Sequence, residues 1–176
     1  MNLTLARKVI AAAEKKAATI GQPMNIAVVD EGGNLVTHVR MDGAWIGSID
    51  ISINKAFTSR AFDIATKDLA EHSQSGGQFF GIHVSNHGRI MIFAGGIPIR
   101  MGGKVIGAIG VSGGSGEQDH SVAEAGTGVV SWQSLPKVKA AFIEPMPRRD
   151  FVFASALVES EGVHDRLIQS GHPIDA

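Results

Sequence analysis

Glycines, a serine and carboxylates are concentrated between residues 110 and 119, where two kinds of chemistry are conceivable. The segment GVSGG at residues 110–114 matches G-x-S-x-G, the pattern of the nucleophile elbow in α/β-hydrolases. That elbow needs a helix that starts at the serine, whereas two glycines and then Ser115-Gly116 separate Ser112 from the next helical segment. We therefore predict that Ser112 ends a strand and enters a loop, and that it is not a nucleophile.

The same turn is a candidate anion site. Gly113 and Gly114 can turn main-chain N–H groups toward a ligand, and the N-terminus of a helix predicted near Glu117 adds a partial positive charge. No Gly-Lys-Ser/Thr follows, so the turn is not a phosphate-binding Walker loop. The alternative is a purely structural turn, in which Glu117 and Asp119 complement the helix dipole.

Two cations form a second constellation. Arg40 closes a predicted strand just before Asp42, and Lys55 lies in the middle of a predicted helix among apolar neighbours. A cation in such surroundings needs a partner or a ligand. Lys55 either pairs with Asp42 or Glu117, or it holds an anionic ligand together with Arg40, which offers a bidentate fork.

The histidines give weaker signals. His83 and His87 have a spacing that would share one face of a helix, but they flank a predicted turn, so we predict no metal site. His38 and His120 are interpreted as surface or satisfied histidines, with a ligand or general-base role as the alternative. Cysteine is absent, which excludes disulfides, thiolate metal sites and cysteine nucleophiles.

Periodicity and turn residues predict the elements that position these groups. We expect helices over residues 4–20, 48–65, 66–72 and 117–132, and strands over 25–29, 35–41, 81–84, 89–94, 97–101 and 104–111. Short hairpin connections dominate, so the chain should be an α+β domain with about five mainly antiparallel strands. Glycines inside the segment KVIGAIGV at residues 104–111 indicate that another element packs closely on this strand.

The composition bounds the class of protein. The chain has 176 residues, of which 44% are hydrophobic and 19% charged, with a net charge of −1. These values predict a globular domain over residues 1–132 without a nucleic-acid interface. Neither a signal peptide nor a membrane span is apparent, so we expect a cytoplasmic protein. Residues 133–176 read as a proline-interrupted extension whose apolar segment, starting at Phe151, packs on its own domain or on a neighbouring subunit.

Six segments together resemble the GlcG/HbpS family, which includes the C-terminal domain of PduO-type proteins. They are AVVD at residues 27–30, RMDGA at 40–44, INKAFT at 53–58, GGIPI at 95–99, GAIGVSGG at 107–114 and EQD at 117–119. The resemblance runs in order from about residue 3 to residue 130. It implies a profilin-like α/β/α sandwich with a five-stranded antiparallel sheet and assembly into tetramers, hexamers or octamers.

The function implied by the resemblance is less uniform. Some members bind or degrade haem, whereas others are encoded beside enzymes that catabolise small polyols and acids. Tyrosine is absent here, and the predicted first helix, where a haem ligand of the PduO-type domain would be sought, lacks His and Met. We therefore predict a cofactor-independent enzyme for hydrolytic deamination, hydration or isomerisation of a small unsaturated carboxylate. The alternatives are an HbpS-type haem-binding or haem-degrading protein and a non-catalytic accessory subunit.

In the predicted enzyme, cations grip the carboxylate, a carboxyl group positions water or moves a proton, and turn amides stabilise developing negative charge. The predicted catalytic residues are Glu117, Asp119, Lys55 and His83. The predicted ligand-binding residues are Arg40, Asp42, Lys55, Gly113, Gly114 and Gln118.

Overall fold

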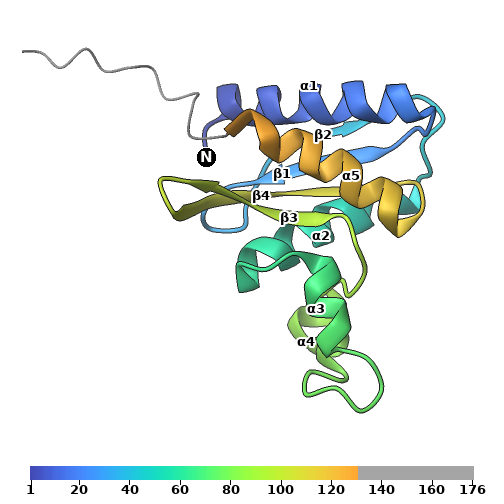
Figure 1. Ribbon diagram of the computed structural model, residues 1–176, viewed down its shortest axis with the longest axis vertical. Coiled ribbons are helices and arrows are strands. Elements are labelled where there is room, and N and C mark those ends of the chain that lie inside the picture. Colours follow the sequence, from blue (N-terminus) through green and yellow to red (C-terminus); the bar gives the residue numbers. More distant parts are fainter. Residues whose placement is uncertain (131–176) are drawn as a thin grey trace, which may run out of the picture. The chain divides into compact units, whose positions relative to one another are not determined.

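The computed structural model describes residues 1–130, which form one antiparallel sheet with helices on both faces (Figure 1). The strands are β1 (Asn25–Val29), β2 (Leu35–Arg40), β3 (Gly96–Met101) and β4 (Lys104–Ser112). They lie in the order β2-β1-β4-β3, so two hairpins meet at the central pair β1 and β4. The α+β prediction and the predicted hairpins are confirmed, with four strands in place of about five.

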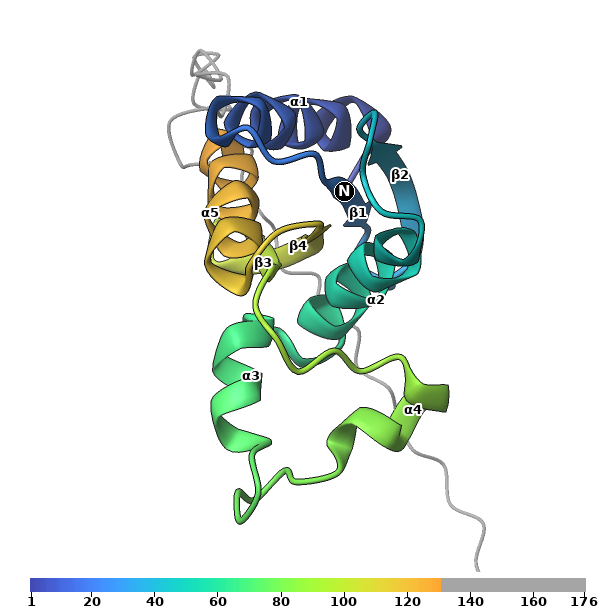
Figure 2. The same ribbon diagram turned by 90° about the vertical axis from the view of Figure 1, so that its right-hand side faces the viewer.

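Two helices cover one face of the sheet. Helix α1 (Leu3–Ile20) lies beside α5 (Gly116–Thr127), which continues into the short 3-10 turn η2 (Gly128–Val130) (Figure 2). Their apolar side chains meet those of β1 and β4 in the main hydrophobic core, which includes Val9, Ala13, Ile26, Ile109 and Val122. Burial of these aliphatic groups is the main source of the domain's stability.

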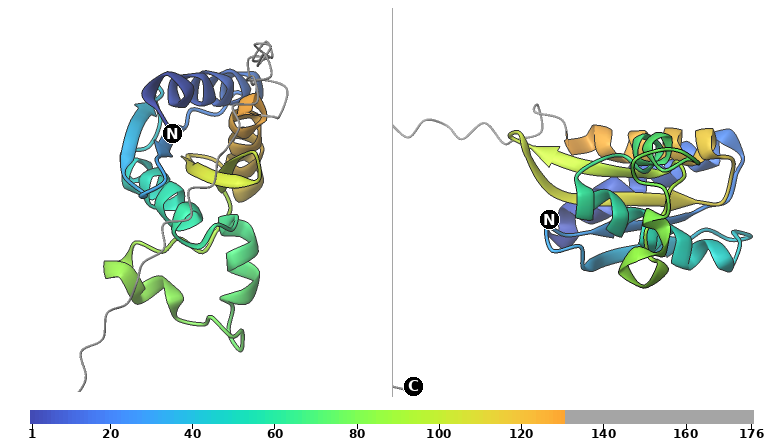
Figure 3. Two further views of the ribbon diagram at one scale, coloured as in Figure 1. Left: turned by 90° about the vertical axis from the view of Figure 1, so that its left-hand side faces the viewer. Right: turned by 90° about the horizontal axis from the view of Figure 1, so that it is seen from below.

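Helix α2 (Gly47–Phe62) packs on the opposite face (Figure 3). It approaches β4 so closely that a Cβ on Gly110 would run into the Ser52 carbonyl oxygen and the Ala56 amide nitrogen. The glycines of β4 therefore admit a neighbouring helix, as the sequence predicted. Close backbone approach also explains why the face of α2 that meets the sheet carries small residues.

The segment between α2 and β3 extends away from the sheet and contains α3 (Thr66–His72), η1 (Ile82–Val84) and α4 (Ser85–Gly88) (Figure 2). The predicted strands over residues 81–84 and 89–94 are wrong. Asn86 and His87 have left-handed φ values of 52° and 59°, which turn the chain away from an extended path.

The apolar residues 89–94 then cross α2 instead of joining the sheet. Their backbone is hydrogen bonded to a side chain, because the Thr58 hydroxyl accepts from the Met91 amide at 2.9 Å and donates to the Arg89 carbonyl oxygen at 3.2 Å. In a β-strand, these backbone groups would have been hydrogen bonded to the backbone of a neighbouring strand. The hydrophobicity of this segment reflects packing on a helix, with Ile90 fully buried.

Some predictions fall on residues outside the described range. The extension over residues 133–176, the apolar segment at Phe151 and the domain boundary at Trp132 lie beyond residue 130 and stay predictions. Among the helices of residues 1–130, none is both long and apolar enough to span a membrane.

Candidate functional site

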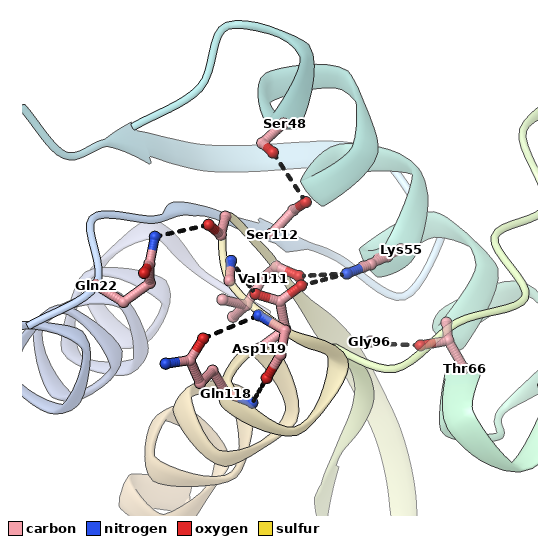
Figure 4. Close-up of polar contacts among 12 residues, drawn as sticks. Gln22, Ser48, Lys55, Thr66, Gly96, Val111, Ser112, Gln118 and Asp119 are labelled. Atoms are coloured by element: carbon pink, nitrogen blue, oxygen red, sulfur yellow. Dashed lines mark hydrogen bonds and ion pairs between the residues drawn. The ribbon is translucent and has the colours of Figure 1, made fainter. Parts of the chain in front are cut away.

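A buried ion pair joins the two helical layers at the end of β4 (Figure 4). The Lys55 Nζ of α2 lies 2.7 Å from Oδ2 of Asp119 in α5, and it also donates to the Val111 carbonyl oxygen at 2.9 Å. The Lys55 side chain is 0% exposed and the Asp119 side chain is 4% exposed. The Phe93 ring centroid lies 4.4 Å from the same ammonium and completes its surroundings.

Glycines make room for this pair. A Cβ on Gly95 would lie 2.9 Å from the Lys55 Nζ and 2.9 Å from the Asp119 Cβ, and the residue has a φ of 120° that side chains disfavour. At Gly96 a Cβ would lie 2.6 Å from the methyl group of Thr66, whose hydroxyl accepts from the Gly96 amide at 2.9 Å. Gly95 therefore leaves space beside the Lys55 ammonium and Asp119, and Gly96 allows close packing against Thr66 and the Lys55 backbone.

Burial perturbs both charges of the pair. Burial lowers the pKa of the Lys55 ammonium, and the neighbouring Asp119 carboxylate opposes this effect. Burial likewise raises the pKa of the Asp119 carboxyl, opposed by Lys55 and by hydrogen bonds from the Gly114 and Gly113 backbone. The two groups stabilise each other's charge inside the protein, so Lys55 is committed to Asp119 and is not available to grip a ligand.

The glycine-rich turn is closed by its own hydrogen bonds. The Gly114 amide donates to Asp119 Oδ1 at 2.9 Å, and the Ser115 amide donates to Gln118 Oε1 at 2.9 Å. Ser115 returns the interaction by accepting from the Gln118 amide at 3.3 Å, which forms a capping box. The prediction that Gly113 and Gly114 line an open anion pocket is therefore contradicted, and the capping alternative describes the turn.

Ser112 is also part of the packing. Its hydroxyl is hydrogen bonded to the Ser48 hydroxyl at 3.1 Å in the interior. Asn25 pairs with Ser112 across the sheet, and its side-chain Nδ2 donates to the Trp45 carbonyl oxygen at 2.9 Å. These bonds fasten the start of α2 and the loop before it to the end of the sheet.

The remaining predicted ligand-binding and catalytic groups lie at the surface. Arg40 is exposed at the end of β2 and donates from Nε to the Ala44 carbonyl oxygen at 2.9 Å. Asp42 and Glu117 are also exposed, and neither pairs with Lys55. Because the Lys55 ammonium is enclosed, the structure contradicts a shared clamp of Arg40 and Lys55 on one carboxylate.

The correct partner of Lys55 left a signal in the sequence. Asp119 is three and four residues before Val122 and Ala123, so these three side chains share the buried face of α5. Glu117 lies on the other side of the helix and is exposed. The helix face would have selected Asp119, whereas the prediction named Asp42 or Glu117 as the partner of Lys55 and is wrong on this point.

The described histidines occupy separate places. His83 and His87 are exposed on η1 and α4, and His120 Nε2 lies 3.4 Å from the Glu124 carboxylate within α5. In residues 1–130 no group of three or more His, Asp or Glu side chains could hold a metal ion. His38 lies on β2, with its Nε2 buried and lacking a hydrogen-bond partner.

His38 should make stability depend on pH. Burial lowers the pKa of His38 below its ordinary value of 6.5. Between the lowered pKa and 6.5 the unfolded chain binds more protons than the folded one, so stability falls as pH falls through this window. The unfolding temperature should be measured at about pH 7.5 and at about pH 5.5. It should fall less between these pH values in His38→Gln than in the unchanged protein. Equal losses in both proteins would contradict this assignment.

These features define a class: a small antiparallel-sheet domain with helices on both faces, crossed by a buried lysine–aspartate pair. The chain belongs to the HbpS-like family, because the family model described as "Haem degrading protein HbpS-like" matches residues 1–128. The resemblance inferred from the six sequence segments is thereby confirmed.

Individual relatives agree with this membership. An uncharacterized 15.0 kDa protein in the dhaT-dhaS intergenic region of Citrobacter freundii is 44% identical over 124 residues, which cover 70% of this chain and 87% of that protein. The crystal structure of Klebsiella pneumoniae protein ORFY is 38% identical with a TM-score of 0.74, covering 77% of this chain and 92% of that one. The PduOC:Heme complex is 28% identical with a TM-score of 0.72, covering 74% and 95%.

The family corrects the predicted reaction. Hydrolytic deamination, hydration or isomerisation of an unsaturated carboxylate finds no support in a family described by haem degradation or in a relative crystallised with haem. The prediction treated charged and polar residues of the six resembling segments as ligand-binding or catalytic groups, whereas Lys55, Asp119 and Gln118 bond within the protein. The haem alternative agrees better with these findings.

Proposed function

We propose that this chain binds haem. The observation that carries the proposal is the likeness of this chain to the PduOC:Heme complex, which extends over 74% of this chain and 95% of that one. Membership of a family described by haem degradation supports it independently. Haem, when bound, supplies an iron centre whose chemistry is set by its axial ligand and by the polarity of its pocket.

The residues present fit this group on one part of the surface. A haem site needs an axial donor such as imidazole within apolar and aromatic surroundings. His83 is exposed on the segment that also carries the exposed side chains of Phe79, Phe80 and Val84. The Lys55–Asp119 pair does not fit, because both of its side chains are buried and bonded to each other.

The proposal predicts saturable binding of equimolar haem. Titration of the full chain with haemin should produce a Soret band that shifts on binding and saturates at stoichiometry, as expected for a ligated iron in an apolar site. Metal-free protoporphyrin is the control, because it shares the apolar surface of haem and lacks the iron. A spectrum that keeps the features of free haemin, or one that never saturates, would refute haem binding.

Haem degradation is the second candidate function, and the description of the family model favours it. The same haem-loaded sample would be supplied with dioxygen and a reductant such as ascorbate. Catalytic degradation would bleach the Soret band and release iron that a chelator can trap. If the Soret band decays no faster than that of free haem, the protein does not degrade haem, and only the binding proposal stands.

Homo-oligomerisation belongs to the same proposal. Trp45 and Ile46, which are 66% and 75% exposed in the single chain, support it because large apolar side chains at such exposure favour association. Light scattering on the haem titration samples would give the number of chains per assembly.

A further inference from the structure

The segment over residues 73–93, here called the arm, concentrates apolar side chains at its surface. Phe79, Phe80, Val84 and Phe93 are 41%, 67%, 73% and 44% exposed. Isolated exposed apolar residues are ordinary, but several within one short segment mark a surface that binds something. The middle of the arm leaves the body of the domain (Figure 2). Phe79, Phe80 and Val84 belong to this part, whereas Phe93 lies where the arm returns and contacts the Lys55 ammonium.

The base of the arm is fixed to α2. The Arg89 guanidinium lies 3.7 Å from the Phe57 ring centroid, and its Nε donates to Asn54 Oδ1 at 3.2 Å. Together with the bonds of Thr58 to the backbone described above, these contacts hold the end of the arm on the helix. The arm is therefore anchored on α2 where it returns to the domain.

Local backbone bonds fix His83 within this surface. The Ile82 amide donates to the Phe79 carbonyl oxygen at 3.0 Å, and the Val84 amide donates to the Gly81 carbonyl oxygen at 3.1 Å. These turns carry His83 on η1 between Ile82 and Val84, three residues after Phe80. The exposed imidazole thus lies within the segment FFGIHV at residues 79–84, which holds the exposed apolar side chains of Phe79, Phe80 and Val84.

Other described histidines fit an iron ligand less well. His72 touches the edge of the Phe79 ring, with centroids 6.2 Å apart. His87 lies in a left-handed turn between Asn86 and Gly88, next to polar neighbours. The Nε2 of His38 is buried, and His120 faces a carboxylate. His164 and His172 lie outside the described residues.

We propose, on the basis of the haem binding proposed above, that His83 is the axial ligand of the haem iron. Phe79, Phe80 and Val84 provide the apolar contacts with the porphyrin. An imidazole within apolar surroundings is one of the common proximal ligands of haem proteins. The assignment also explains how the chain can bind haem although α1 contains neither His nor Met.

The test compares histidine variants of the full chain by absorption spectroscopy and electron paramagnetic resonance. His83→Gly should lose the histidine-ligated signature and bind haem at least about tenfold more weakly. Even a residue that only supports a metal ligand costs about 10–100-fold in affinity when it is mutated. Added imidazole should restore the signature, because the small ligand can occupy the space of the deleted side chain. His72→Ala and His87→Ala serve as matched controls and should keep the unchanged spectrum.

The outcomes separate this inference from the proposed function. If the unchanged protein binds haem and His83→Gly keeps the same signature, His83 is not the ligand, but haem binding stands. If added imidazole does not restore the signature that His83→Gly has lost, His83 has a packing role and is not the iron ligand. If the unchanged protein does not bind haem, the proposed function itself fails. Circular dichroism of each variant confirms that the fold is intact.

Discussion

Replacing Asp119 with alanine is expected to destabilise the domain by about 3–5 kcal/mol, the range observed when one partner of a buried ion pair is removed. The change leaves the Lys55 ammonium, which is 0% exposed, without its carboxylate. It also removes the acceptor of the Gly114 amide at the start of α5. Because small domains are stable by only about 5–15 kcal/mol, this loss should be visible as a large shift in urea unfolding.

Two further variants separate the charge effect from general damage. Glu117→Ala removes an exposed carboxylate from the same turn and should leave the unfolding midpoint nearly unchanged. The double variant Lys55→Met, Asp119→Leu removes both charges and should recover most of the stability, because apolar residues often replace buried ion pairs at little cost. If Asp119→Ala unfolds at the same urea concentration as Glu117→Ala, the buried pair does not stabilise the domain.

The elements that surround this pair could largely be predicted from the sequence. Helical periodicity located α1 and α5, and a short predicted connection located the β3–β4 hairpin. These signals are local, so a single sequence carries them. The glycines of β4 also indicated close packing, which the contact of Gly110 with α2 confirms.

The arm could not be predicted in the same way. Its residues 89–94 have the hydrophobicity of a buried strand, and no local signal shows that their backbone will bond to the Thr58 hydroxyl on α2. Short apolar runs are ambiguous when their partner lies elsewhere in the chain. This error added a strand to the expected sheet, which has four strands instead of about five.

The candidate site was predicted in part. An enclosed lysine was correctly expected to need a partner, but the choice of Asp119 depends on which face of α5 packs against the sheet. The absence of His and Met from α1 was taken as evidence against haem. That step assumed that the axial ligand must come from the same element in every relative, whereas the fold also presents imidazoles on the arm.

Replacing Gly110 with alanine is expected to cost about 3 kcal/mol, the upper part of the usual range for overpacking a core. The new methyl group would run into the Ser52 carbonyl oxygen and the Ala56 amide of α2, and both are backbone atoms. Backbone cannot turn aside as a flexible side chain does, so the helix itself must move off β4. Because Lys55 belongs to the same helix, this displacement should also disturb its bond to Asp119.

Gly128→Ala is the matched control for this prediction. Gly128 has a φ of −58°, and a Cβ there would meet nothing within 4 Å. The substitution should therefore be neutral or slightly stabilising, since alanine reduces the freedom of the unfolded chain at both positions equally. Urea unfolding followed by circular dichroism would compare the two variants. Equal midpoints for Gly110→Ala and Gly128→Ala would show that α2 can shift without cost, and that close packing on β4 does not hold the layers together.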